Sequence, residues 1–242
     1  MLLIFLVFLV AMLYASVGHG GASGYLAVMS LIGGYSPALM STSALILNLL
    51  VAGTAWLTFW RMGHGSWSEL WPFVVSSIPA AFIGGWLAVS VQTYRLLLAG
   101  CLLVAAMRLS LPSLREEIHC QAPPLSVALP VGGVLGVVSG IVGVGGGIFL
   151  SPLMVLLRWA DMKRTAAISA AFIVVNSLAG LAGRLIAGRL LIDSMALILI
   201  AALMGGVVGS RLGAKHFSGL WLRRLLAVVL VVAAGKLVFS HA

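Results

Sequence analysis

Ten apolar stretches follow one another along the chain, separated by short polar or turn-rich breaks. They cover residues 1–17, 21–33, 37–60, 69–91, 93–110, 125–142, 146–158, 165–187, 190–213 and 220–239. Several approach the roughly 20 residues that an α-helix needs to cross a bilayer. Ser36 before Pro37, and Asp161 further on, are suitable helix N-caps. The pattern predicts an all-α integral membrane protein built from these segments.

Composition supports the membrane assignment and leaves no room for a soluble domain. The 242 residues are 62% hydrophobic and 8% charged, with a mean hydropathy of +1.19, whereas a soluble domain carries about 25% charged residues. The run from Met1 to Val17 has no Lys or Arg in front of it, so we interpret it as the first helix rather than a signal peptide. Cys101 and Cys120 are too few for a disulfide framework.

The two halves of the chain resemble each other. YRLLLAGCLLVAAMRL at 94–109 and LRRLLAVVLVVAAGKL at 222–237 match at nine of sixteen positions, 128 residues apart. GHGGAS at 18–23 also matches GVGGGI at 143–148, 125 residues apart. Each half holds five apolar segments, an odd number, so a duplicated second half would be inverted in the membrane. We expect a first inverted repeat at 1–110, a linker at 111–124 and a second inverted repeat at 125–242.

Basic residues indicate the orientation of the chain in the membrane. If successive segments alternate sides, ten basic residues fall on one side and four on the other, and the first side is then cytoplasmic. The four on the opposite side are Arg95, Arg184, Arg189 and Lys236. We therefore expect a multi-pass protein of the cell (inner) membrane with a cytoplasmic linker and both termini outside the cytoplasm. The lipid bilayer is an expected partner and nucleic acid is not.

Glycine-rich breaks precede two short segments, 21–33 and 146–158. Thirteen residues of helix span about 20 Å, less than the roughly 30 Å of a bilayer core, so both segments would start near the midplane, as re-entrant tips or as short spans. A helix N-terminus presents unpaired N–H groups and partial positive charge, and glycine lets an anion approach. Pairs such as Gly84 with Gly85 and Gly205 with Gly206 are instead expected to serve helix packing.

The charged and polar residues indicate that the substrate is an anion. All five acidic residues lie in loops or at segment ends, so no span offers a carboxylate to a cation, and Arg184 can snorkel from the last turn of its segment. Ser41 with Asn48 recurs as Ser169 with Asn176, 128 residues on. We expect no metal, no cofactor and no catalytic residue. The candidate substrate-binding residues are Gly18, His19, Gly20, Gly21, Ser41, Ser43, Asn48, Gly143, Gly145, Gly146, Gly147, Ser169 and Asn176.

Two stretches resemble the paired signatures of the sulfite exporter TauE/SafE family of membrane permeases. They are VGHGGASGYLAVMSLIGGYSPALMSTSALILN at 17–48 and GVGGGIFLSPLMVLLRWADMKRTAAISAAFIVVNSLAGL at 143–181, where Pro152 follows Gly147 by five residues. The resemblance implies a duplicated helical permease that moves sulfite, organosulfonates or related small sulfur-containing anions by alternating access. The first copy departs from the pattern, with His19 and Ala22 in its glycine motif and Ala27 at the place of Pro152.

Other functions stay open on the sequence alone. The permease could carry another small anion, such as a carboxylate. An intramembrane serine hydrolase would use Ser23 as nucleophile and His19 as base, but Ile148 replaces Ser23 in the second copy. The sequence leaves open the direction of transport, the coupling ion and the oligomeric state, a homodimer among the options. We expect a transporter rather than an enzyme.

Overall fold

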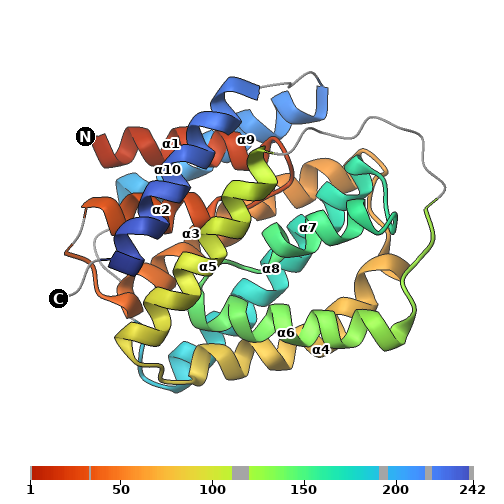
Figure 1. Cartoon of the computed structure of the whole chain (residues 1–242). Coiled ribbons are helices and arrows are strands. Elements are labelled where there is room, and N and C mark those ends of the chain that lie inside the picture. Colours follow the sequence, from red (N-terminus) through yellow and green to blue (C-terminus); the bar gives the residue numbers. More distant parts are fainter. Residues whose placement is uncertain (1, 33, 111–119, 191–195, 216–219, 240–242) are drawn as a thin grey trace.

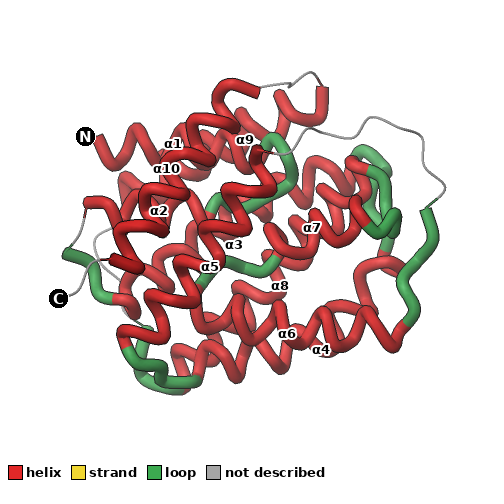
Figure 2. Tube along the Cα trace, viewed as in Figure 1, coloured by secondary structure: helices red, strands yellow, loops and turns green. Residues whose placement is uncertain are grey.

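The computed structural model describes residues 2–32, 34–110, 120–190, 196–215 and 220–239. Over these residues the chain forms ten helices joined by loops, and no strand (Figure 1, Figure 2). The helices are α1 (Leu2–Ala15), α2 (Ala22–Ile32), α3 (Pro37–Arg61), α4 (Trp67–Trp86), α5 (Val91–Ser110), α6 (Leu125–Val142), α7 (Gly147–Leu156), α8 (Met162–Ile186), α9 (Ala196–Lys215) and α10 (Leu220–Phe239). Each corresponds to one apolar segment, which confirms the all-α prediction.

Helix length separates spanning segments from short ones. Among the described residues, Pro37–Arg61, Leu125–Val142 and Lys163–Ile186 are long and apolar enough to cross a membrane. In contrast, α2 has 11 residues and α7 has 10, well below the roughly 20 needed. Both short helices directly follow a glycine motif, as the sequence predicts.

Side-chain caps define where α3 and α8 begin. The Ser36 hydroxyl accepts a hydrogen bond from the backbone N–H of Leu39, and Asp161 accepts from those of Lys163 and Arg164. Both caps were expected from the sequence, because a hydroxyl or carboxylate oxygen satisfies N–H groups that lack a partner in the first helical turn.

The two capped helices pack against each other at the centre of the molecule and run antiparallel. Each has 25 residues. At one end, Ser36 before α3 and Arg184 near the end of α8 line the same cavity. At the other end, Arg164 in the first turn of α8 bonds Glu69 of α4, shortly after α3 ends, with an Nη1–Oε1 distance of 3.0 Å. An antiparallel central pair is what inversion of one half would require.

The outer helices pack mostly against the other half of the chain. α4 packs on α6 and α8, α1 packs on α9, α3 packs on α9 as well as α8, and α5 packs on α10 (Figure 1). If the two halves are equivalent, α1 corresponds to α6, α3 to α8 and α4 to α9. The α4–α6 contact then corresponds to the α9–α1 contact, and the α4–α8 contact corresponds to the α9–α3 contact. This packing is compatible with a duplicated chain. The two-fold relation and the repeat boundaries stay predictions, and most of the linker, 111–119, lies outside the described residues.

Close helix contacts explain the paired glycines outside the motifs. A Cβ added at Gly85 would overlap the backbone of Gly180 in α8, and one added at Gly205 would overlap the Phe8 carbonyl in α1. A side chain at either position would force two helix backbones apart. The packing role expected for these glycines is therefore confirmed.

Candidate substrate site at the glycine breaks

Two loops interrupt the helices inside the bundle. The first glycine loop, residues 16–21, joins α1 to α2, and the second glycine loop, residues 143–146, joins α6 to α7. Gly21 and Gly146, the residues just before the two short helices, have φ angles of 89° and 76°. This left-handed region is open to glycine at little cost and unfavourable to other residues. The sharp turn that starts each short helix therefore requires glycine.

The two loops lie against α3 and α8 and cross from one half to the other. A Cβ added at Gly18 would overlap the backbone of Ala166 in α8, and one added at Gly143 would overlap the backbone of Ser41 in α3. Each loop thus packs against the central helix of the opposite half. These close approaches bring together residues that are more than 100 positions apart in the sequence.

Asn48 joins the two glycine loops. Its side chain is fully buried in α3, and its Nδ2 donates to the Val144 carbonyl of the second loop at 3.2 Å. Its Oδ1 has no hydrogen-bond partner and faces Gly20 of the first loop, where an added Cβ would overlap it. A Cβ at Gly145 would likewise press on Nδ2. Since an amide nitrogen carries two hydrogens, Asn48 keeps one donor beyond its bond to Val144.

Asn176 has different surroundings, although the sequence pairs it with Asn48. Its Nδ2 donates to the Phe172 carbonyl one turn earlier in α8, at 2.8 Å. The first residues of α3 and α8 are Pro37 and Met162, which are 125 positions apart, not the 128 of the sequence match. By that spacing the counterpart of Asn48 is Ile173, which contacts Gly145 as Asn48 contacts Gly20. The structure therefore places Asn48, and not Asn176, between the loops.

His19 connects the first loop to the second half. Its Nε2 lies 2.9 Å from the Ser151 hydroxyl of α7, which is 2.8 Å from the Ser169 hydroxyl of α8. The Nδ1 atom lies 2.9 Å from the Val17 carbonyl, which can only accept, so Nδ1 carries a proton. In a neutral ring Nε2 is then an acceptor, and the Ser151 hydroxyl has Nε2, the Gly147 carbonyl at 2.9 Å and the Ser169 hydroxyl within hydrogen-bond distance. Sequence reasoning missed Ser151, whose only signal was its place one turn after Gly147.

The other candidates lie in the same central region. Ser41 is buried in α3, one turn after its first residue, and its hydroxyl donates to the Pro37 carbonyl at 2.6 Å. Ser43 is also buried in α3. Gly147, the first residue of α7, packs against Ile173 and the Ser169 carbonyl of α8.

Comparison with known proteins decides the family. A family model described as sulfite exporter TauE/SafE matches residues 3–237 of the chain. The chain belongs to the TauE/SafE family. A probable membrane transporter protein of Sinorhizobium fredii, y4hK, is 36% identical to this TauE/SafE protein over 236 residues, which cover 96% of this chain and 95% of that one. No solved structure matches this chain. This TauE/SafE protein is thus a multi-pass membrane permease of the cell membrane.

The cavity that described residues of this TauE/SafE permease form beside the first glycine loop is very small. Between the first glycine loop, Val144, Ile148 and Ile173 lies a cavity of about 10 Å³, which is about the volume available to one water molecule. An oxyanion such as sulfite would need more room. The structure therefore shows the glycine loops in a closed arrangement.

The hydrogen bonds direct Ser23 and His19 to different partners. The Ser23 hydroxyl lies 2.7 Å from the Tyr14 hydroxyl, and both side chains are buried. His19 Nε2 bonds Ser151 instead. A serine nucleophile needs a base within hydrogen-bond reach, and the bond to Tyr14 does not supply one. This geometry argues against the hydrolase alternative.

We expect Ser23→Ala to keep the transport rate of the TauE/SafE permease within about twofold, because the change removes one neutral hydrogen bond, worth about 1 kcal/mol. A fluorophosphonate probe should label neither this variant nor the parent protein. Stoichiometric labelling of the parent that disappears in Ser23→Ala would restore the hydrolase.

Arg184 does not snorkel, contrary to the sequence-based expectation. The residue is 5% exposed, and its Nη2 donates to the Gly140 and Ile141 carbonyls at 2.7 and 2.8 Å. These carbonyls belong to the last turn of α6, where they have no partner within their own helix. The guanidinium therefore turns into the protein, because packing of α8 on α6 offers it acceptors there.

Within the described residues, no group of three or more His, Cys, Asp or Glu could hold a metal ion.

Proposed function

We propose that this protein is a permease for small oxyanions, sulfite and organosulfonates foremost, and that the anion binds between the two glycine loops. The observation that carries the proposal is Asn48, a fully buried amide in contact with both loops. Because Asn48 contacts both loops, its side chain would also contact an anion bound between them.

The donors at this place suit an anion. α2 and α7 both begin at the loops, and the first N–H groups of a helix have no partner within the helix and carry partial positive charge. Glycines at these positions let an oxygen atom approach the backbone. The described acidic residues, Glu69 and Asp161, lie at the starts of α4 and α8, and they bond Arg164 there. An oxyanion would therefore meet donors and no competing carboxylate from these two residues.

Alternating access is supported by the contacts that cross between the halves. The bond from His19 to Ser151 ties the first loop to α7, and the bond from Asn48 to Val144 ties α3 to the second loop. Entry of an anion into a cavity of about 10 Å³ requires such contacts to lengthen or break. Rocking of two inverted halves around a central site would open it to one side at a time.

A ligand panel tests the proposed function and ranks the substrates. Binding to the folded state raises apparent stability by RT ln(1 + [L]/Kd), so the thermal shift of the purified protein should rank sulfite, sulfoacetate, taurine, sulfate and small carboxylates. Flux of the best ligand is then measured in proteoliposomes. We expect sulfite or a sulfonate to give the largest shift and saturable flux. A larger shift and flux with a carboxylate would assign that substrate class instead, and no shift or flux with any member would contradict the proposal.

A further inference from the structure

Four basic residues converge on two cavities at one end of the bundle. Arg184 and Arg189 line a cavity of about 320 Å³, and Arg95 and Lys236 line one of about 190 Å³. Pro37, Val91 and Tyr94 line both cavities, so the two adjoin. These are the four basic residues that the alternation of segments assigns to the non-cytoplasmic side. Of the described residues that line the two cavities, none is acidic.

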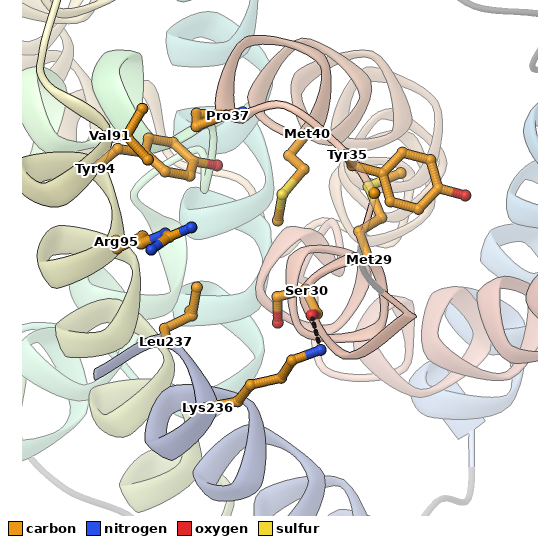
Figure 3. A pocket seen from close by; sticks show the side chains of 11 residues that line it. Met29, Ser30, Tyr35, Pro37, Met40, Val91, Tyr94, Arg95, Lys236 and Leu237 are labelled. Carbon is orange, nitrogen blue, oxygen red and sulfur yellow. Dashed lines mark hydrogen bonds between the residues drawn. The ribbon is translucent and has the colours of Figure 1, made fainter. Parts of the chain in front are cut away.

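Figure 3 shows the smaller cavity, with Tyr94 and Arg95 of α5 on one side and Lys236 of α10 below. The Lys236 ammonium donates to the Ser30 and Leu31 carbonyls, both at 3.0 Å, in the last turn of α2. Helix carbonyls satisfy hydrogen bonds but bring only partial negative charge. The positive charge of the ammonium is therefore not neutralised by this contact.

The larger cavity contains two buried donor groups with unused capacity. The Arg184 Nε has no hydrogen-bond partner, and within the described residues its guanidinium has no ion-pair partner. The Tyr94 residue is 3% exposed, and its hydroxyl makes no hydrogen bond of good geometry; the Ser41 hydroxyl beside it donates to the Pro37 carbonyl. Buried polar groups are normally satisfied, and a buried charge without a counter-charge is costly. A bound oxyanion would supply both the acceptors and the charge.

The larger cavity lies close to the second glycine loop. Ser41 lines it, and the backbone of Ser41 packs against Gly143, the first residue of the second glycine loop. An anion in this cavity is thus separated from the second loop by one residue of α3.

We propose that the two cavities form an anion vestibule, in which Arg184 and Tyr94 bind the oxyanion on the non-cytoplasmic side of the glycine loops. This inference rests on the proposed function. Arg95, Arg189 and Lys236 draw anions toward the opening by their charge, an effect that salt screens. Arg184 offers the planar donor geometry that suits sulfonate or sulfite oxygens, and Tyr94 adds a hydroxyl donor.

The test measures sulfite binding to the full-length protein in nanodiscs of zwitterionic lipid, and sulfite flux in proteoliposomes of the same lipid. Arg184→Gln should raise the half-saturating sulfite concentration at least tenfold, and Tyr94→Phe three- to tenfold. Arg189→Gln should raise it two- to threefold and weaken its dependence on ionic strength. Arg61→Gln, an exposed residue at the opposite end of α3, should stay within twofold as the matched control.

Several outcomes separate the vestibule from the central site. Sulfite binding that persists in Asn48→Leu and disappears in the Asn48→Leu, Arg184→Gln double variant would support a separate vestibule. Saturable flux in the parent protein with unchanged half-saturation in Tyr94→Phe and Arg189→Gln would overturn the vestibule and leave the permease. This holds even if Arg184→Gln does not fold. No sulfite binding or flux in the parent would overturn both.

Anionic phospholipids also carry negatively charged oxygen atoms, in their phosphate groups. A separate experiment therefore tests whether they bind in the vestibule. Phosphatidylglycerol is added to the nanodiscs for the parent and for Tyr94→Phe. Competition with sulfite in the parent that weakens in Tyr94→Phe would support oxyanion binding in the vestibule. Stabilisation by phosphatidylglycerol without any effect of Tyr94→Phe on sulfite would show a lipid site and overturn the vestibule.

Discussion

Replacing Gly20 with Ala is expected to reduce anion transport at least tenfold. Gly20 does not adopt a positive φ, so the change adds no left-handed backbone strain. Its added Cβ would overlap Oδ1 and Cγ of Asn48, and the amide must therefore leave its place between the two glycine loops. Flux is measured in proteoliposomes, with thermal unfolding and size-exclusion chromatography to confirm that the variant is folded and monodisperse.

A matched control and a double variant show whether the effect passes through Asn48. A Cβ added at Gly53, on the same helix as Asn48, meets nothing within 4 Å, so Gly53→Ala should transport normally. It should be as stable as the parent or more so, since alanine favours a helix interior by about 1 kcal/mol over glycine. On an Asn48→Ala background, Gly20→Ala should change flux by less than twofold. Full transport in Gly20→Ala alone would mean that the contact with Asn48 serves packing only.

The second large effect is expected for Asn48→Leu, which should weaken anion binding by about 1.5 to 3 kcal/mol, the range for a hydrogen bond to a charged group. This corresponds to a roughly 10- to 150-fold higher dissociation constant. Leucine has a similar volume but no donor, so the spare N–H of the amide and its bond to Val144 are both lost. The affinity is measured by calorimetry or from the thermal shift with sulfite.

Asn176→Leu provides a strict comparison, since Asn176 is equally buried and lies on the other central helix. The Asn176 amide donates to the Phe172 carbonyl within α8. We therefore expect the dissociation constant of sulfite in Asn176→Leu to stay within about twofold of that in the parent protein. Equal losses in the two variants would instead favour the symmetric roles that the sequence match predicts. Unchanged affinity in Asn48→Leu would remove Asn48 from the site.

Much of the fold could be predicted from local sequence alone. The segment predicted at 125–142 coincides with α6 (Leu125–Val142), and that predicted at 37–60 differs from α3 (Pro37–Arg61) by one residue. Polar breaks, prolines and capping residues mark these ends clearly. The glycine breaks could also be predicted, because no other residue combines small size with free access to positive φ.

Contacts between distant helices could not be predicted in the same way. The match of Asn48 with Asn176 is displaced by three residues from the spacing that the helix starts define. Positions three apart lie on nearly the same face of a helix, so an apolar pattern cannot distinguish the two alignments. Arg184 illustrates the same limit, since its acceptors lie at the end of α6, and nothing near Arg184 in the sequence indicates them.

The packing of α1 on α9 has a consequence for how the protein is made. α1 (Leu2–Ala15) is synthesised well before α9, which begins only at Ala196. At typical elongation rates of 5–20 residues per second, α1 waits on the order of 10–40 s for its main partner. During this time its Tyr14 hydroxyl can already bond Ser23, nine residues later in the chain. Chains interrupted before α9 would leave α1 without its partner, and membrane quality-control proteases should remove them quickly.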